Sequence, residues 1–137
     1  VWAVPYDYRD ACSQAPDICL GVPFFNWGPS YLATAKAVQD GSWEAGIAWN
    51  GADWADMTNP DTSNVGWISG SAIEGNEEWK ANLDDFISKL ASGDVHVWDG
   101  PVNLQDGTPL VAEGETATDL QVWYLEQLPE GVTGPSE

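Results

Sequence analysis

Residues 1–31 read VWAVPYDYRDACSQAPDICLGVPFFNWGPSY, and this stretch decides the expected fold. Residues 1–4 are short and apolar, as a strand covered on both faces should be, and polar and aromatic residues begin where that strand would end. Residues 20–22 repeat the pattern, and Pro29 then stands in the first turn of a helix expected to reach about Val38. The stretch predicts an α/β fold with a parallel sheet flanked by helices.

The residues that follow these two strands are the candidates for contacting a ligand. Ligands in open α/β sheets lie outside the carboxyl ends of the strands, where two strand ends and a helix N-terminus are here expected to converge. A carboxylate such as Asp7 accepts hydrogen bonds from ligand hydroxyl or amine groups, although the same residue can simply cap a loop. The predicted ligand-binding residues are Tyr6, Asp7, Phe25, Asn26, Trp27 and Trp54.

Nine tryptophans in 137 residues form a second strong signal. Most are expected to be structural because a Trp ring buries a large area, and Trp79 and Trp123 fall on the apolar stripes of predicted helices. Trp27 and Trp54 instead fall in loops among Asn, Asp and Gly. A flat ring in such a loop either packs the loop down or offers a stacking face to a ring-shaped ligand.

The rest of the chain alternates between predicted strands and helices. Asn76 marks the N-cap of an amphipathic helix that ends at Ser92-Gly93. The pair Asp106-Gly107 between apolar residues predicts a hairpin turn. The further expected elements are strands over 47–50, 65–69 and 95–97, a helix from Thr118 or Asp119 through Leu128, and a loose tail over 131–137.

Cys12 and Cys19 lie close together in a polar loop between the first two predicted strands. We expect a disulfide, because it would staple this loop beside the site and stabilise the fold by about 2.5 kcal/mol in the chain-entropy model. A disulfide implies an oxidising compartment. Zinc is disfavoured because the spacing is not Cys-x-x-Cys and the single histidine, His96, falls in a different strand. A catalytic cysteine would need a basic neighbour, and only Arg9 is near.

The charge balance restricts the partners of the chain. Four Lys and Arg residues against 22 Asp and Glu residues give a formal net charge of −18. This sign excludes a nucleic-acid polymer or an anionic membrane surface as a partner, and it predicts a solubilising acidic exterior. No apolar run approaches the length needed to span a bilayer.

Several motifs follow one another along nearly the whole chain. They are VPYDY over residues 4–8, the pair Cys12 and Cys19, GVPFFNWGPSY over 21–31, GPVNLQDGT over 100–108 and AEGE over 112–115. Together they resemble the C-terminal part of the basic membrane protein (BMP) family. Members of that family are extracytoplasmic substrate-binding lipoproteins of ABC importers, and several bind nucleosides or purines.

The resemblance implies a fold like that of type I periplasmic binding proteins, with this chain as the C-terminal fragment of a two-lobed protein. Residues 1–130 would span parts of both lobes, followed by the tail over 131–137. A small cyclic ligand, such as a nucleoside or purine, would be held between the lobes without a cofactor. The implied partners are ABC permease subunits and the N-terminal remainder of the protein. The implied location is the periplasm or the outer face of the cell membrane, with a lipid anchor outside this chain.

The resemblance also bears on single residues. A carboxylate at the first strand end helps to hold the ligand in the BMP family, which implies that role for Asp7. Pro5 stands where many members carry another Asp, and Phe25 stands near a position where nucleoside binders tend to carry a basic residue. An aromatic-rich pocket with one carboxylate suits a neutral or cationic cyclic ligand better than an anion.

Two other functions compete with binding and transport. Asp53 with Asp56, or Asp84 with Asp85, could be offered as a glycosidase carboxylate pair, but close pairs arise by chance in so acidic a chain. The sequence contains no nucleophile elbow, phosphate loop or dinucleotide fingerprint, and we therefore predict no enzyme. A carbohydrate-binding module, or a glycosidase-associated domain that uses exposed Trp residues, is the stronger rival. Such modules are mostly all-β, whereas the sequence of this chain predicts three helices.

Overall fold

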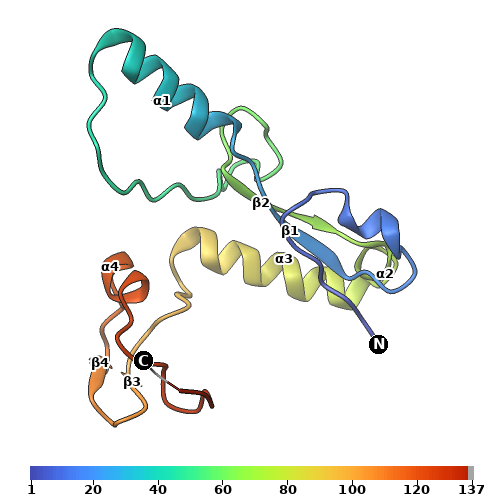
Figure 1. Ribbon diagram of the computed structural model, residues 1–137. Helices are drawn as coiled ribbons and strands as arrows, with labels where there is room; N and C mark the ends of the chain where they lie inside the picture. The colour runs from blue at the N-terminus through green and yellow to red at the C-terminus, as the bar shows by residue number, and fades with distance from the viewer. Residues whose placement is uncertain (136–137) are drawn as a thin grey trace. The chain divides into compact units, whose positions relative to one another are not determined.

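The computed structural model describes residues 1–135 as a mixed α/β structure of two compact units, Val1–Asp85 and Phe86–Glu137 (Figure 1). The first unit contains the 3₁₀ helix η1 (Ala11–Gln14), β1 (Gly21–Phe25), α1 (Gly28–Asp40), β2 (Val65–Ser69), α2 (Ser71–Glu74) and the start of α3 (Glu77–Ser92). The second contains β3 (Val102–Asn103), β4 (Pro109–Val111) and α4 (Asp119–Trp123). Among these helices none is long and apolar enough to cross a bilayer.

β1 and β2 form a two-stranded antiparallel sheet in which Phe25 lies opposite Val65. The predicted strand over 65–69 is confirmed, and the strand predicted over 20–22 extends to Phe25. The expected parallel order does not hold for this pair of strands. The register brings the chain that leaves β1 beside the chain that enters β2, and the pocket described below lies at this end of the sheet.

The N-terminal segment runs parallel to β1 but pairs with it at isolated points. The prediction of a continuous strand over 1–4 is therefore wrong. Pro5 accounts for the gap, because proline has no N–H to donate to a ladder. The two parallel bridges join Ala3 with Cys19 and Asp7 with Phe24.

The core of the first unit lies beneath the predicted disulfide, which is present. Cys12 and Cys19 have Cα atoms 5.5 Å apart. Cys19, Val22 and Phe24 are only 2%, 0% and 5% exposed, and Ile68 of β2 packs against them. Burial of a Val or Phe side chain stabilises a fold by about 1.5–3 kcal/mol, so this cluster anchors β1.

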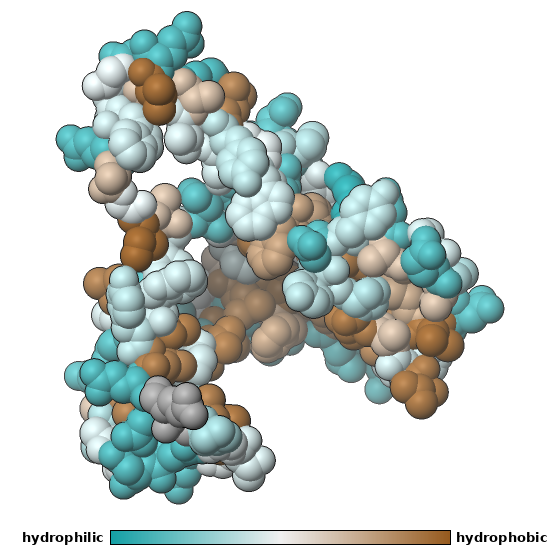
Figure 2. Space-filling view, in the orientation of Figure 1, coloured by the Kyte–Doolittle hydropathy of each residue, from teal (hydrophilic) through white to brown (hydrophobic). Residues whose placement is uncertain are grey.

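α1 and α3 confirm the two longer helices predicted from the sequence. Pro29 lies in the first turn of α1, and Gly41 ends that helix with a left-handed φ of 77°. Leu32 and Val38 of α1 are 56% and 62% exposed, and Figure 2 shows apolar side chains at the surface over this helix. α3 follows Asn76, whose side-chain oxygen accepts a backbone N–H of the first turn at 3.1 Å.

Two predicted strands do not form. Residues 47–50 lie in a long irregular connection between α1 and the loop before β2, and residues 95–97 lie in the turn after α3. A strand is stabilised by pairing, and neither segment meets a partner strand within residues 1–135. Apolar composition alone was therefore a poor guide at these two places.

The hairpin predicted at Asp106-Gly107 joins β3 to β4. Gly107 adopts a φ of 84°, which favours glycine, and the carboxylate of Asp106 accepts the backbone N–H two residues later at 2.8 Å. Gln127 donates to the other oxygen of Asp106 at 2.9 Å. Leu104 and Val111, at 8% and 3% exposure, form the buried part of this unit.

The last helix starts as predicted but is shorter than expected. Thr118 and Gln121 form a capping box at its N-terminus, and α4 ends at Trp123 instead of Leu128. Pro129 is held in a bridge to Leu104 and disfavours a helical conformation at Leu128, whereas nothing in the structure explains why the helix already ends at Trp123. The predicted loose tail over 131–137 stays a prediction, since residues 136–137 lie outside the described chain.

Candidate functional site

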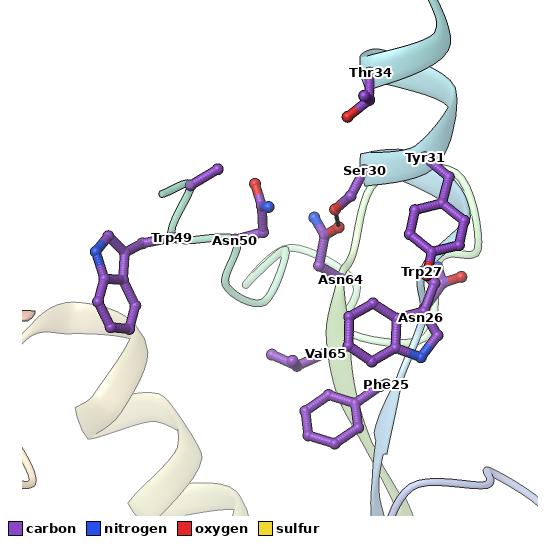
Figure 3. Close-up of a pocket in the computed structure, with 11 residues that line it drawn as sticks. Phe25, Asn26, Trp27, Ser30, Tyr31, Thr34, Trp49, Asn50, Asn64 and Val65 are labelled. Carbon is purple, nitrogen blue, oxygen red and sulfur yellow. Dashed lines mark hydrogen bonds between the residues drawn. The ribbon is translucent and has the colours of Figure 1, made fainter. Parts of the chain in front are cut away.

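A pocket of about 360 Å³ lies in the first unit, at the end of the β1–β2 sheet (Figure 3). Its walls come from three places: the end of β1 with the first two turns of α1, residues 48–50 of the irregular connection, and the chain entering β2. Ligand pockets for small molecules typically measure about 300–1,000 Å³. The volume therefore suits a small molecule.

One wall of the pocket is a row of three aromatic rings. Trp27 lies in the middle, with its ring centroid 5.5 Å from that of Phe25 and 6.1 Å from that of Tyr31. Trp27 and Tyr31 are nearly parallel, at 28°, and Phe25 is tilted by 38° from Trp27. The three rings are 46–68% exposed. Such a row is an extended apolar face against which a flat ring can stack.

Asn26 has a structural role that the sequence did not indicate. Its side-chain amide donates to the carbonyl oxygens of Pro60 and Ser63 at 2.8 and 2.7 Å, and its Oδ1 accepts the backbone N–H of Gly28 at 3.3 Å. Both amide hydrogens are therefore used to fasten the loop before β2 to the start of α1. Contact with a ligand would have to use the remaining lone pair on Oδ1.

The polar lining of the pocket is uncharged. Ser30 donates its hydroxyl hydrogen to Oδ1 of Asn64, as the dashed line in Figure 3 shows. Thr34, on the next turn of α1, and Asn50, on the irregular connection, line the same space. Hydroxyls and carboxamides both donate and accept hydrogen bonds, so this lining can hold a neutral polar ligand without burying an unpaired charge.

The loop between residues 51 and 64 is held by its own side chains. Ser63, only 1% exposed, accepts the backbone N–H of Asp53 at 2.9 Å and donates to the carbonyl oxygen of Val65 at 2.7 Å. The hydroxyl of Thr62 and the N–H of Ala55 donate to the carboxylate of Asp53 and lower its pKa below the ordinary aspartate value. A carboxyl held in its ionised form is poorly suited to act as a general acid.

Two further members of the predicted carboxylate pairs, Asp56 and Asp84, also have plain structural partners. Asp56 accepts from the backbone N–H and hydroxyl of Thr58 at 2.9 and 2.8 Å. Asp84 accepts from Lys80 at 3.2 Å along α3 and raises the pKa of that lysine. The Lys80–Asp84 ion pair is exposed and contributes little to stability.

The structure brings together three of the six predicted ligand-binding residues. Phe25, Asn26 and Trp27 line the pocket, whereas Tyr6, Asp7 and Trp54 are outside its lining. The backbone of Asp7 lies beside Phe25, which donates its N–H to the carbonyl oxygen of Asp7 at 3.1 Å. Asp7 also has a φ of 81°, an unusual conformation for a residue other than glycine. Its predicted ligand contact stays a prediction, as do those of Tyr6 and Trp54.

Tyr31, Ser30, Asn50 and Asn64 line the pocket but were missed in the sequence. A signal existed for Tyr31, because it follows Trp27 by four positions and residues at that spacing share one face of a helix. Only the pairing of β1 with β2 places Asn64 at the pocket, because Asn64 directly precedes Val65, the residue of β2 that lies opposite Phe25.

The chain was compared with protein families and with curated proteins. No family model matches the chain. A purine-binding protein of Brucella abortus strain 2308 is 28% identical to it over 110 residues, which cover 80% of this chain and 29% of that protein. The chain therefore spans less than a third of the length of this relative, which is a binding protein.

Proposed function

We propose that this chain is part of an extracytoplasmic solute-binding protein of an ABC importer, and that it captures a small cyclic ligand of the purine or nucleoside class. The observation that carries the proposal is the pocket beside Phe25, Trp27 and Tyr31, in which an aromatic row meets an uncharged polar lining. A flat heterocycle stacks on aromatic rings with its polar edge free for hydrogen bonds. The likeness to a purine-binding protein supports the same ligand class.

The proposed fold is that of type I periplasmic binding proteins, with this chain as a C-terminal portion. A second lobe, from outside residues 1–137, would close over the ligand. The ligand would stabilise the closed state because it binds that state more tightly than the open state. ABC permease subunits would receive the ligand, and a lipid anchor outside this chain would hold the protein at the membrane. The disulfide between Cys12 and Cys19 supports an oxidising, extracytoplasmic location.

The charge of the ligand follows from the lining of the pocket. None of the described residues that line the pocket is charged, so an anionic ligand would find no cation there. Asp7 lies next to Phe25 along the sheet and would favour a neutral or cationic ligand nearby. We therefore expect a neutral base or nucleoside to bind better than a nucleotide.

Calorimetric titration of the full-length protein with adenine, hypoxanthine and their nucleosides tests the proposal. Stacking of a base on an aromatic ring contributes about 1–3 kcal/mol, so Trp27→Ala should weaken binding by about 5- to 100-fold. Trp123→Ala is the matched control, because Trp123 is exposed to a similar degree, 61% against 56%, and lies in the second unit, outside the pocket lining. Absence of binding to all four compounds by the unaltered protein would contradict the proposed function.

A further inference from the structure

One amide group in the pocket is aimed in a fixed direction. The hydroxyl of Ser30 donates to Oδ1 of Asn64, which leaves the two hydrogens of the Asn64 amide nitrogen on the other side of the group. Figure 3 shows this nitrogen on the side of the group where Asn50 lies. Asn64 therefore presents hydrogen-bond donors, and not an acceptor, to the space between these residues.

The backbone of Asn64 is held on both sides. Its N–H donates to the carbonyl oxygen of Gly51 at 3.2 Å, and its carbonyl oxygen accepts the N–H of Asn26 at 2.8 Å. Its side chain has intermediate exposure, so the amide is partly shielded from water but still reachable. A donor fixed in this way loses little freedom when a ligand binds, which makes its contribution to affinity larger.

The amide of Asn64 lies in the same pocket lining as the aromatic row. The residue after Asn64, Val65, pairs with Phe25, the first ring of the aromatic row, and all three residues line the pocket. A flat ring stacked on the row would keep its in-plane edge free to meet polar groups of the same lining, among them the amide of Asn64. Ring nitrogens and exocyclic oxygens of a neutral heterocycle accept hydrogen bonds in that plane.

We propose that Asn64 is a specificity-determining residue that donates a hydrogen bond to an acceptor atom on the edge of a planar, uncharged heterocycle, with Ser30 as its positioning residue. This inference rests on the proposed function, because it takes the same pocket as the ligand site. A site built to hydrogen-bond a substrate rejects analogues that lack the partner atom far more strongly than a site that relies on apolar contact. Asn64 would thus supply selectivity, and the aromatic row would supply affinity.

The test is Asn64→Asp in the full-length protein, titrated with hypoxanthine and with adenine. Aspartate keeps an oxygen for the Ser30 hydroxyl but replaces the donating nitrogen with a charged acceptor. Loss of a hydrogen bond together with repulsion between acceptors should weaken binding by about 10- to 100-fold. Asn76→Asp is the matched control. It adds the same charge at a helix N-cap, where aspartate also caps well, and its affinity should equal that of the unaltered protein.

The possible outcomes separate the inference from the proposed function. If the unaltered protein binds neither hypoxanthine nor adenine, both the proposed function and the inference fail. If it binds and Asn64→Asp binds equally well, the inference alone is overturned. Should thermal unfolding show that Asn64→Asp does not fold, Ser30→Ala replaces it. That variant releases the Asn64 amide and should weaken binding by about threefold or more, and unchanged affinity would overturn the inference.

Discussion

The two stretches of chain that border the pocket are built in opposite ways. We call residues 51–64 the tied loop and residues 42–50 the open segment. The tied loop contains a buried residue, Ser63, whose hydroxyl bonds to backbone groups of Asp53 and Val65, and the carboxylate of Asp53 accepts the N–H of Ala55. The open segment has no regular structure, and its large apolar side chains, Trp43, Ile47 and Trp49, are about half exposed.

The difference follows from side-chain chemistry more than from length. Asp, Asn, Ser and Thr in the tied loop can bond to backbone groups two residues away and so replace a regular ladder. The open segment consists largely of Ala, Gly, Ile and Trp, whose side chains cannot do this. The pocket therefore has one wall that is fixed before a ligand arrives and one wall with few buried contacts, which is the type of region that opens locally.

A pair of glycine substitutions should reveal this contrast most strongly. A Cβ on Gly66 would lie 2.2 Å from the carbonyl oxygen of Met57 in the tied loop and 2.5 Å from the ring of Phe24, whereas a Cβ on Gly46 in the open segment would meet nothing within 4 Å. Gly66→Ala should lower the free energy of unfolding by about 1–3 kcal/mol. Gly46→Ala should change it by less than about 0.5 kcal/mol. Urea unfolding followed by Trp fluorescence measures both changes in unfolding free energy. Equal changes for the two variants would contradict the contrast between the tied loop and the open segment.

Removal of single hydroxyls should give a smaller effect in the same direction. Ser63→Ala deprives the backbone N–H of Asp53 of its buried acceptor and should cost about 1 kcal/mol of stability. Ser42, at the start of the open segment, bonds to Asp40 at 2.6 Å in an exposed position. Ser42→Ala should therefore be close to neutral in the same unfolding assay. A larger loss from Ser42→Ala than from Ser63→Ala would show that the tied loop is not the better anchored region.

Acid should loosen the tied loop, and this is the smallest effect we expect. The pKa of Asp53 is lowered by the Thr62 hydroxyl and the Ala55 N–H, so the folded state binds this proton less well than the unfolded state. Its stabilising contribution is complete above the ordinary aspartate pKa and is lost as the pH falls through the lower folded value. Amide exchange in residues 53–63 should accelerate in that acidic range. Asp53→Asn, which cannot titrate, should lack this acceleration. If exchange in Asp53→Asn depended on pH in the same way as in the unaltered protein, Asp53 would not be the group that stabilises the tied loop.

The sequence predicted those elements whose local signals agree with their packing. α1 has a proline at its start and a glycine at its end, α3 has a cap and an apolar stripe, and β2 is an apolar run flanked by polar loops. The hairpin turn and the disulfide were also predicted correctly. In each case the information lies within a few residues along the chain, where short-range physical preferences operate.

The predictions that were wrong or incomplete depend on contacts between segments far apart in the sequence. The strand expected over 47–50 depends on a partner that composition cannot specify, and the parallel order expected for β1 and β2 depends on how distant segments pair. Asn26 has the chemistry of a ligand contact, but long-range bonds to Pro60 and Ser63 use its donors. The sequence placed Phe25 and Trp27 beside the candidate pocket because aromatic residues near a strand end are conspicuous, and it missed Asn64 because the place of Asn64 depends on the register of the sheet.

Hydrogen exchange of the full-length protein, with and without saturating hypoxanthine, tests the central claim most directly. Amides of the open segment, residues 42–50, should exchange rapidly without ligand and slow by about tenfold or more when hypoxanthine binds, because ordering that wall completes the pocket. Amides of the tied loop should be protected already and change much less. Protection that appears elsewhere in the chain, with residues 42–50 unaffected, would contradict the account of this pocket as the ligand site.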